Sequence, residues 1–161
     1  MHIETVNTPL GSFVLETTRI GLLTVRFPGA VVPRSDVETL DPAAEKHARA
    51  AKAELLAYLD GDLPVFDTPI DFSGKSAFQR DVLFTLRGVP YGVTVSYKEL
   101  ARRAGYPGAF RAVGGAMKRN RTPIFVPCHR VIAAGNRLGG WSGQAGWKER
   151  LLAHEGIVLY Q

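Results

Sequence analysis

The chain has 161 residues, of which 45% are hydrophobic and 22% are charged, a composition typical of a globular protein with one or two domains. No apolar run is long enough to cross a bilayer and no basic-then-apolar leader is visible, so we expect a cytoplasmic protein without a membrane segment. A single cysteine excludes an internal disulfide, which fits a reducing compartment.

The charge is divided unevenly along the chain. Residues 1–72 hold 6 Lys/Arg and 11 Asp/Glu, a net charge of −5, whereas residues 73–161 hold 14 and 4, a net charge of +10. A basic half beside an acidic half predicts a polyanionic partner for the second half only, although a merely solvated basic surface has the same composition. We therefore predict two domains, residues 1–72, with the connecting segment included, and residues 73–161.

The first half predicts an antiparallel sheet with one covering helix. Asp41 and Pro42 have the form of an N-cap and a first helical residue, and apolar residues then recur at helical spacing as far as Asp60. The isolated histidines, His2 and His47, have no cysteine partners, so we expect no structural zinc site. The three β-prone runs, which turn sequences separate, are residues 3–6, 12–17 and 22–27.

The second half is mainly helical. Ser76 and Gln79 have the Ser-x-x-Gln form of a capping box, and Ser96 and Glu99 form a second box. A helix, a glycine-containing turn and a second helix then follow, which is the outline of a helix-turn-helix, although many helical hairpins share it. The helices that we expect are residues 77–87, 97–104, 109–118 and 145–154.

The helix expected at residues 109–118 is nearly free of bulky side chains. Each of Gly114 and Gly115 costs roughly 1 kcal/mol of helix stability relative to alanine, so their presence needs a reason. One interpretation is close packing between two helices. The other is that a smooth helix lies against a DNA strand while Arg111 projects into it.

Cys128 is the only cysteine of the chain. It follows the apolar run 124–126, which we predict as a short buried strand that Pro127 ends. A lone cysteine is most often an inert core residue. A thiol with a pKa of roughly 8.5 needs a nearby base or positive charge to act as a nucleophile at neutral pH, and His129 is such a group. Because neighbours on a strand point to opposite faces, a bend or a bridging water would have to connect the two.

Glu155 stands at the end of the last expected helix, where the macrodipole disfavours an acidic residue. This placement indicates a specific partner for Glu155, and His129 is the natural one. Between these two residues, Ala134-Gly135-Asn136 predicts a hairpin turn. The expected arms of the hairpin are residues 130–133 and 137–141.

Three motifs lie in the second half, at residues 111–116 (RAVGGA), 127–131 (PCHRV) and 151–156 (LLAHEG). Together they resemble the O6-alkylguanine-DNA alkyltransferases, or methylated-DNA–protein-cysteine methyltransferases. The resemblance is dense from Ser76 to Gly156, and over residues 1–72 it covers only the order of the elements.

The resemblance implies an α+β fold with two domains. The N-terminal one would be an α/β domain like ribonuclease H, and the C-terminal one a winged-helix-like, helix-turn-helix domain that binds DNA and carries the active site. The implied activity is direct DNA repair, in which the alkyl group of O6-alkylguanine, with O4-alkylthymine as a second candidate substrate, moves irreversibly and stoichiometrically to Cys128 after nucleotide flipping. The partner is double-stranded DNA, bound through its minor groove by a monomer acting singly or cooperatively, and no cofactor or metal is implied.

The resemblance also assigns roles to single residues. Cys128 is the nucleophile, and Glu155, His129 and a bridging water take up the thiol proton. Tyr97 rotates the 3′ phosphate and helps to protonate the departing guanine. Asn120 is the hinge between the recognition helix and the active-site segment.

Further residues correspond to the DNA contacts and the substrate pocket of the family. Arg111 resembles the arginine finger that replaces the flipped nucleotide. Phe110 stands where a small residue is expected, and Trp141 where tyrosine is common. Arg119 and Arg121 would add phosphate contacts and steepen the salt dependence of binding. The remaining DNA-binding residues implied are Tyr97, Ala109, Ala112, Gly114 and Lys118, and the pocket residues are Val131, Trp141, Ser142 and Lys148.

Two other classes of protein remain open. A non-enzymatic DNA-binding protein, either a helix-turn-helix regulator or a lesion sensor, would use the same basic half, but such sensors lack the cysteine that this chain has. A cysteine hydrolase using Cys128 and His129 would turn over repeatedly and would not need the basic half.

Overall fold

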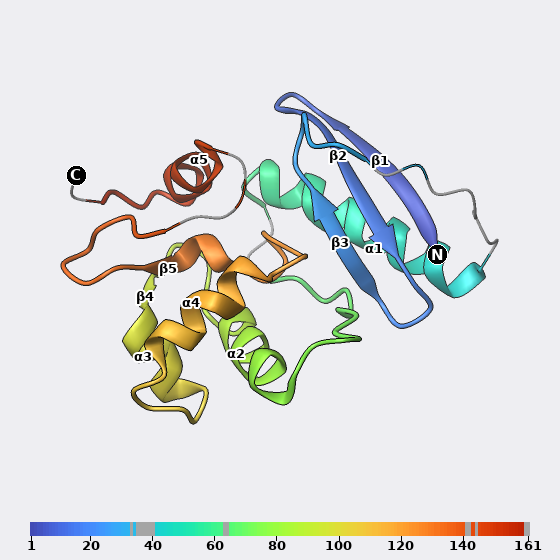
Figure 1. Ribbon diagram of the computed structural model, residues 1–161. Helices are drawn as coiled ribbons and strands as arrows, with labels where there is room; N and C mark the ends of the chain where they lie inside the picture. The colour runs from blue at the N-terminus through green and yellow to red at the C-terminus, as the bar shows by residue number, and fades with distance from the viewer. Residues whose placement is uncertain (33, 35–40, 63–64, 141–142, 144, 160–161) are drawn as a thin grey trace. The chain divides into compact units, whose positions relative to one another are not determined.

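The computed structural model describes residues 1–32, 34, 41–62, 65–140, 143 and 145–159 (Figure 1). The chain forms two compact units, Met1–Ser73 and Gly74–Gln161, which we call unit 1 and unit 2. Helices and short sheets make up a mixed α/β structure, as expected. No helix within the described ranges is long and apolar enough to span a membrane.

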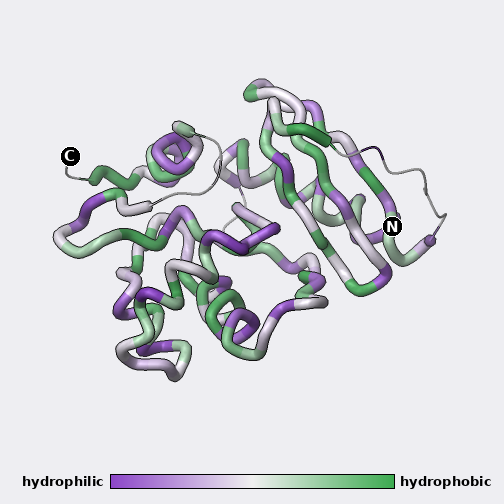
Figure 2. The backbone as a smooth tube through the Cα atoms, viewed as in Figure 1, coloured by the Kyte–Doolittle hydropathy of each residue, from purple (hydrophilic) through white to green (hydrophobic). Residues whose placement is uncertain are grey.

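Unit 1 is a sheet with one helix on it. Strands β1 (His2–Thr8), β2 (Gly11–Thr17) and β3 (Leu22–Arg26) form an antiparallel sheet in the order β1-β2-β3, which confirms the three predicted strands. Helix α1 (Pro42–Leu59) packs against the sheet (Figure 1). Hydrophobic and hydrophilic residues both occur along each strand in Figure 2, as expected when only one face of a sheet is buried.

The start of α1 follows the sequence prediction. The Asp41 side chain accepts a hydrogen bond from the amide of Ala43 at 3.0 Å, and Pro42 occupies the first turn, where its missing N–H leaves no gap in the helix. The helix ends before Asp60, as predicted. The buried side chains along α1 are those that the helical spacing indicated: Ala44, Ala48, Ala51, Leu55 and Tyr58.

Unit 2 contains the remaining helices. Helices α2 (Ala77–Arg87), α3 (Tyr97–Arg103) and α4 (Phe110–Lys118) pack against one another (Figure 1). Strand β4 (Val95–Ser96) pairs in parallel with β5 (Val131–Ile132), and α5 (Trp147–His154) packs against the short 3₁₀ helix η1 (Cys128–Arg130).

The two capping boxes differ in the structure. The box of Ser76 and Gln79 is complete, with both reciprocal hydrogen bonds present. In the second box the Ser96 side chain accepts from the amide of Glu99 at 3.0 Å, but the Glu99 carboxylate turns away from Ser96. It binds the guanidinium groups of Arg102 and Arg103 instead, because two cations are stronger partners for a carboxylate than one amide.

The predicted strand at residues 124–126 is wrong. This run is buried but forms a turn, with Ile124 in the left-handed region at φ 74° and the amide of Val126 bonded to the Thr122 carbonyl at 2.9 Å. Pro123 and Pro127 provide no N–H to a sheet on either side of the run. The apolar composition of residues 124–126 therefore indicated burial correctly but did not indicate an extended backbone.

The predicted hairpin is present in a shorter form. The amide of Ala133 donates to the Arg137 carbonyl at 2.9 Å across a single bridge. Gly135 and Asn136 both have positive φ, 74° and 59°, which suits the tight turn that joins the two arms. Helix α5 begins at Trp147, two residues later than expected.

Candidate active site

Cys128 begins the 3₁₀ helix η1 directly after Pro127, and β5 follows that helix. Because β5 pairs with β4, the chain leaving η1 is fixed next to the start of α3. The thiol residue is buried, with 7% of its surface exposed. Cys128 and His129 therefore lie in a turn and not on a strand, so their side chains are not held on opposite faces.

His129 is held by Glu155, the partner that the sequence suggested. The imidazole Nε2 donates to the Glu155 carboxylate oxygen Oε2, and both side chains have no exposed surface. This bond places the remaining proton of the neutral ring on Nε2 and leaves Nδ1 as an acceptor. Nδ1 is buried and has no hydrogen-bond partner in the part of the chain that the structure describes.

Two further donors bind the other oxygen of Glu155. The Arg130 Nε donates to Oε1 at 2.7 Å, and the amide of Gly92 donates at 2.9 Å. A second guanidinium nitrogen, Nη1 of Arg130, donates to the Val89 carbonyl at 2.7 Å. Gly92 has φ of 77°, so a glycine suits the turn that brings its amide to the carboxylate. Neither Arg130 nor Gly92 was predicted as a site residue. Arg130 directly follows His129 in the sequence, which was the one available sign that it could share the carboxylate of Glu155.

The network sets the charge of each group at neutral pH. Burial raises the pKa of Glu155, but the bonds from His129 and Arg130 outweigh it and hold that pKa at about 2. Burial lowers the pKa of His129 despite the adjacent carboxylate. Burial raises the pKa of the Cys128 thiol to about 11, against the opposing influence of Asn120 and Lys148. The resting site therefore combines a carboxylate, a neutral imidazole and a protonated thiol.

Lys148 and Tyr97 both donate a hydrogen bond to the Gly140 carbonyl. The buried ammonium Nζ of Lys148 donates to the Val131 carbonyl at 2.7 Å and to the Gly140 carbonyl at 3.3 Å. The hydroxyl of Tyr97 donates to the Gly140 carbonyl at 3.3 Å. Burial lowers the pKa of Lys148 to about 8, with the Cys128 thiolate acting in the opposite direction. Burial and then the negative charge of a Cys128 thiolate raise the pKa of Tyr97.

Asn120 connects α4 to the turn before Cys128. Its side-chain Nδ2 donates to the Val126 carbonyl at 2.9 Å, and its Oδ1 accepts from the amide of Thr122 at 3.1 Å. The backbone amide of Asn120 donates to the Met117 carbonyl at 3.1 Å. These bonds connect the end of α4 to the turn that leads to Cys128.

Apart from Tyr97, the first residue of α3, the predicted DNA-binding residues lie along one face of α4 or at its start. Phe110, Arg111, Ala112 and Lys118 are exposed, and Ala109 at the N-cap is half-buried. Close helix packing does not explain the glycines. Apart from chain neighbours and the backbone of α4 itself, a Cβ atom added at Gly114 would meet no described atom within 4 Å, and at Gly115 it would meet only the Arg119 side chain. The opposite face, formed by Val113, Ala116 and Met117, is buried.

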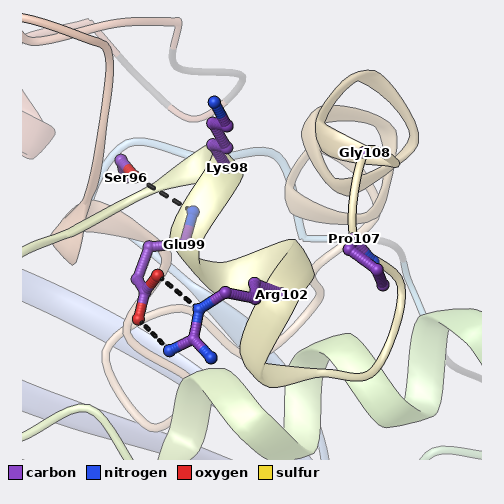
Figure 3. A pocket seen from close by; sticks show the side chains of 6 residues that line it. All are labelled: Ser96, Lys98, Glu99, Arg102, Pro107 and Gly108. Carbon is purple, nitrogen blue, oxygen red and sulfur yellow. Dashed lines mark hydrogen bonds and ion pairs between the residues drawn. The ribbon is translucent and has the colours of Figure 1, made fainter.

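Two predicted pocket residues, Trp141 and Ser142, lie outside the described residues. A separate surface pocket of about 220 Å³ lies between the start of α3 and the turn before α4 (Figure 3). In it the Arg102 guanidinium binds both oxygens of Glu99, at 2.9 and 2.7 Å. Its lining contains neither the thiol nor the His129 network, so this pocket is not the candidate reaction site.

Comparison with known proteins gives the family. Residues 77–157 match the family model described as 6-O-methylguanine DNA methyltransferase, DNA binding domain. Over 99% of its length, the chain is 37% identical to the human methylated-DNA–protein-cysteine methyltransferase, of which the match covers 82%. It is 39% identical to the protein of the same name from Methanosarcina acetivorans, with 97% of this chain and 99% of that one covered.

Solved structures agree with these matches. The crystal structure of Mycobacterium tuberculosis OGT in complex with DNA has a TM-score of 0.80 and 38% identity, and the match covers 97% of this chain and 93% of that one. The O6-methylguanine-DNA methyltransferase of the archaeon Pyrococcus kodakaraensis has a TM-score of 0.69 and 26% identity, with coverage of 96% and 98%. The chain therefore belongs to the methylated-DNA–protein-cysteine methyltransferase family.

Proposed function

We propose that the protein repairs alkylated DNA directly, by moving the alkyl group from O6-alkylguanine to the sulfur of Cys128. The observation that carries the proposal is the buried thiol next to a histidine whose Nε2 is held by Glu155 and whose Nδ1 makes no bond to a described group. Such a histidine is oriented as a general base. Family membership supports the same activity.

The reaction moves one alkyl group from oxygen to sulfur. The Cys128 sulfur attacks the alkyl carbon, a C–S bond forms and the C–O6 bond of the lesion breaks. The thiol proton passes to Nδ1 of His129, either directly or through a bridging water, and the carboxylate of Glu155 stabilises the imidazolium that forms. Tyr97 supplies a proton to the departing guanine and regains one from the imidazolium. Guanine is restored and the protein holds a thioether.

The thioether makes the reaction stoichiometric. Regenerating Cys128 would require its thiolate to leave from the alkyl carbon of a neutral thioether, where it is a poor leaving group, so each protein molecule acts once. The same reasoning accepts alkylated O4 of thymine as a second candidate substrate, since the reacting group is again an alkyl ether.

Arg130 supports the site from behind Glu155. Its hydrogen bond, after the larger influence of His129, helps to keep the carboxylate ionised at neutral pH, and its bond to the Val89 carbonyl fixes the guanidinium plane. Lys148 holds the Val131 carbonyl, three residues after Cys128. Val131, Lys148, Trp141 and Ser142 are the proposed pocket for the flipped base.

We further propose that α3 and α4 form a helix-turn-helix within a winged-helix-like unit 2, and that unit 1 is like ribonuclease H. The α4 face would enter the minor groove, where contacts go mainly to the backbone and sequence preference is weak. Arg111 is the proposed finger for the gap left by the flipped nucleotide, because it is exposed and projects from a low surface. Tyr97, Ala109, Phe110, Ala112, Gly114 and Lys118 complete the proposed DNA contacts.

The remaining proposals concern the organisation of the protein. We propose a monomer on DNA, bound singly or cooperatively. The domain boundary proposed near residue 72 separates the acidic from the basic half. A cytoplasmic location suits a DNA substrate and a thiol that has to stay reduced.

The test is the mass of the intact protein after incubation with duplex DNA that contains one O6-methylguanine. We expect the mass of one methyl group per molecule and never more, located on the peptide that contains Cys128. The Cys128→Ser variant should gain no mass yet retain binding to the lesion. Unmodified wild-type protein that still binds would support a lesion sensor instead, and repeated turnover would support a hydrolase.

A further inference from the structure

We propose that Phe110 is a wedge residue, whose ring stacks on a base beside the nucleotide that the protein extrudes. Two adjacent side chains would then open the duplex: Arg111 fills the gap and Phe110 covers the exposed face of a neighbouring base. The inference rests on the proposed function and deepens it, because it names a second group that opens the DNA.

The first argument is the exposure of the ring at the start of α4. Phe110 is 45% exposed, whereas the other bulky apolar residues of this helix, Val113 and Met117, are 0% and 9% exposed. A single exposed apolar residue is common on protein surfaces, so exposure alone does not indicate a ligand. The residues next to Phe110 on the helix show which kind of ligand fits this surface.

Those neighbours form a cationic surface from which few bulky side chains project. Arg111 and Lys118 are exposed on α4, and Gly114 lies between them with no described atom within 4 Å of an added Cβ. Neither cation forms a salt bridge within the described part of the chain. A ligand that matches this face has negative groups along its edges and flat apolar groups between them. DNA has both, since phosphates line the groove and base faces become accessible wherever a step is unstacked.

The second argument is the rigid support of Phe110. The turn before α4 is fixed to α2 through Tyr106, whose hydroxyl donates to the Asp81 carboxylate at 2.5 Å. The Tyr106 ring also packs edge-on against Phe78, with 4.8 Å between the ring centroids. The amide of Ala109 donates to the Tyr106 carbonyl at 3.1 Å, so the helix start follows directly from this anchor. The backbone that carries Phe110 is therefore fixed before DNA binds, and its ordering adds little to the cost of binding.

The chemistry of the ring fits one step of the reaction. Extruding a nucleotide exposes the faces of the bases beside it, and an aromatic side chain restores part of the lost stacking. Apolar side chains that enter the minor groove are a known means of unstacking base steps. The effect should therefore appear only with duplex DNA, where stacking has to be broken, and not with a free base.

The experiment compares two substrates in the full chain. Transfer rate constants are measured with duplex DNA containing one O6-methylguanine and with the free base O6-benzylguanine. The rate constant for the duplex is divided by that for the free base, and this ratio is compared between variants. For Phe110→Ala we expect this ratio to fall roughly tenfold or more, because base–aromatic stacking is lost. Phe110→Trp should keep the ratio within about threefold of the wild type, and Phe110→Leu should lie between.

The matched control is Phe84→Ala. Phe84 is a phenylalanine on α2 with 73% exposure, so its removal tests the loss of an exposed ring as such. We expect no change in the ratio for this variant. An unchanged ratio in Phe110→Ala would overturn the proposal, as would an equal fall in Phe84→Ala.

A second readout follows the base stack itself. Duplex DNA with 2-aminopurine beside the lesion should become more fluorescent on binding if its base is unstacked, and a stacked ring should then limit that rise. We therefore expect a larger rise in fluorescence for Phe110→Ala than for the wild type. Identical traces would contradict stacking. Failure of the wild-type protein to alkylate Cys128 with either substrate would refute the proposed function and not the wedge alone.

Discussion

An ion pair of unit 1 and the ionic network of unit 2 differ in how deeply they are buried. In unit 1 the Glu4 carboxylate meets the Lys52 ammonium at 2.8 Å, and the two side chains remain 26% and 42% exposed. In unit 2 Glu155 binds Arg130 and His129 with its carboxylate wholly buried. Exposed ion pairs contribute about 0–1 kcal/mol, whereas a buried charge that loses its partner costs several. The Glu4–Lys52 pair of unit 1 is therefore a surface pair, whereas the network of Glu155 in unit 2 is a costly buried one beside Cys128.

The largest effect should come from breaking that network. Glu155→Ala leaves the Arg130 guanidinium buried without its carboxylate and removes the acceptor that orients His129. We expect a loss of about 3–5 kcal/mol in the free energy of unfolding and no measurable transfer. Urea unfolding and the mass assay measure the two quantities.

Its matched control is Glu4→Ala in unit 1. This variant breaks an exposed pair, so we expect about 1 kcal/mol or less and normal transfer. Equal destabilisation by the two variants would show that burial does not distinguish the two networks.

His129→Gln should have the next largest effect, on rate. We expect a 10²- to 10⁴-fold slower transfer to free O6-benzylguanine at pH 7, about the usual contribution of a general base. Without the base only the thiolate reacts, and since the pKa of Cys128 is raised to about 11, the rate should rise about tenfold per pH unit between roughly 7 and 10. The wild-type rate should not show this tenfold rise per pH unit, because the pKa of His129 is lowered and the imidazole is already neutral over that range. Parallel profiles would exclude His129 as the base.

Acid should destabilise unit 2 through the same groups. The pKa of Glu155 is depressed to about 2 from an ordinary 4.5, so its contribution is complete above 4.5 and is lost as the pH falls toward 2. The pKa of His129 is also lowered, so below its ordinary value of 6.5 the unfolded chain binds a proton that the folded chain resists. Both effects favour unfolding in acid. Tryptophan fluorescence reports on unit 2 alone, since both tryptophans lie in residues 73–161, and Glu155→Gln should flatten its pH dependence between about 2 and 4.5.

The smallest effect concerns the basic surface of unit 2. Lys75 donates to the Arg119 carbonyl at 2.5 Å, and its pKa is lowered by burial and by Arg121 and Arg119. Such clustered cations favour a phosphate as partner. We expect Arg121→Gln to reduce the slope of log Kd against log salt by about 0.9, the value for one lost phosphate contact. The exposed Arg49 of unit 1 is the control, and Arg49→Gln should leave the slope unchanged.

The sequence predicted the parts of the fold that depend on neighbouring residues. The end of α1 at Asp60 and the capping box of Ser76 were predicted correctly, because caps and helical spacing are local. The strand at residues 124–126 was not, because a buried apolar run has the same composition as a turn or a strand.

The site was predictable only in part, for a related reason. Cys128, His129 and Glu155 are marked by residue type and position. The contribution of Gly92 depends on a backbone amide that comes 63 residues before Glu155, and no side chain marks it. Arg130 was visible in its motif, but its role follows from its burial, with 4% of its surface exposed, and from its bonds to Glu155 and the Val89 carbonyl.

Cys128 is the only thiol among the 161 residues, and in the folded protein it is 93% covered. A disulfide reagent added to denatured protein therefore detects every molecule that has not yet reacted and none that has. The free-thiol content of a sample is then a count of the lesions that it has met, and each molecule serves as a dosimeter that records a single event. Repair capacity is fixed by the number of copies present, and only new synthesis restores it.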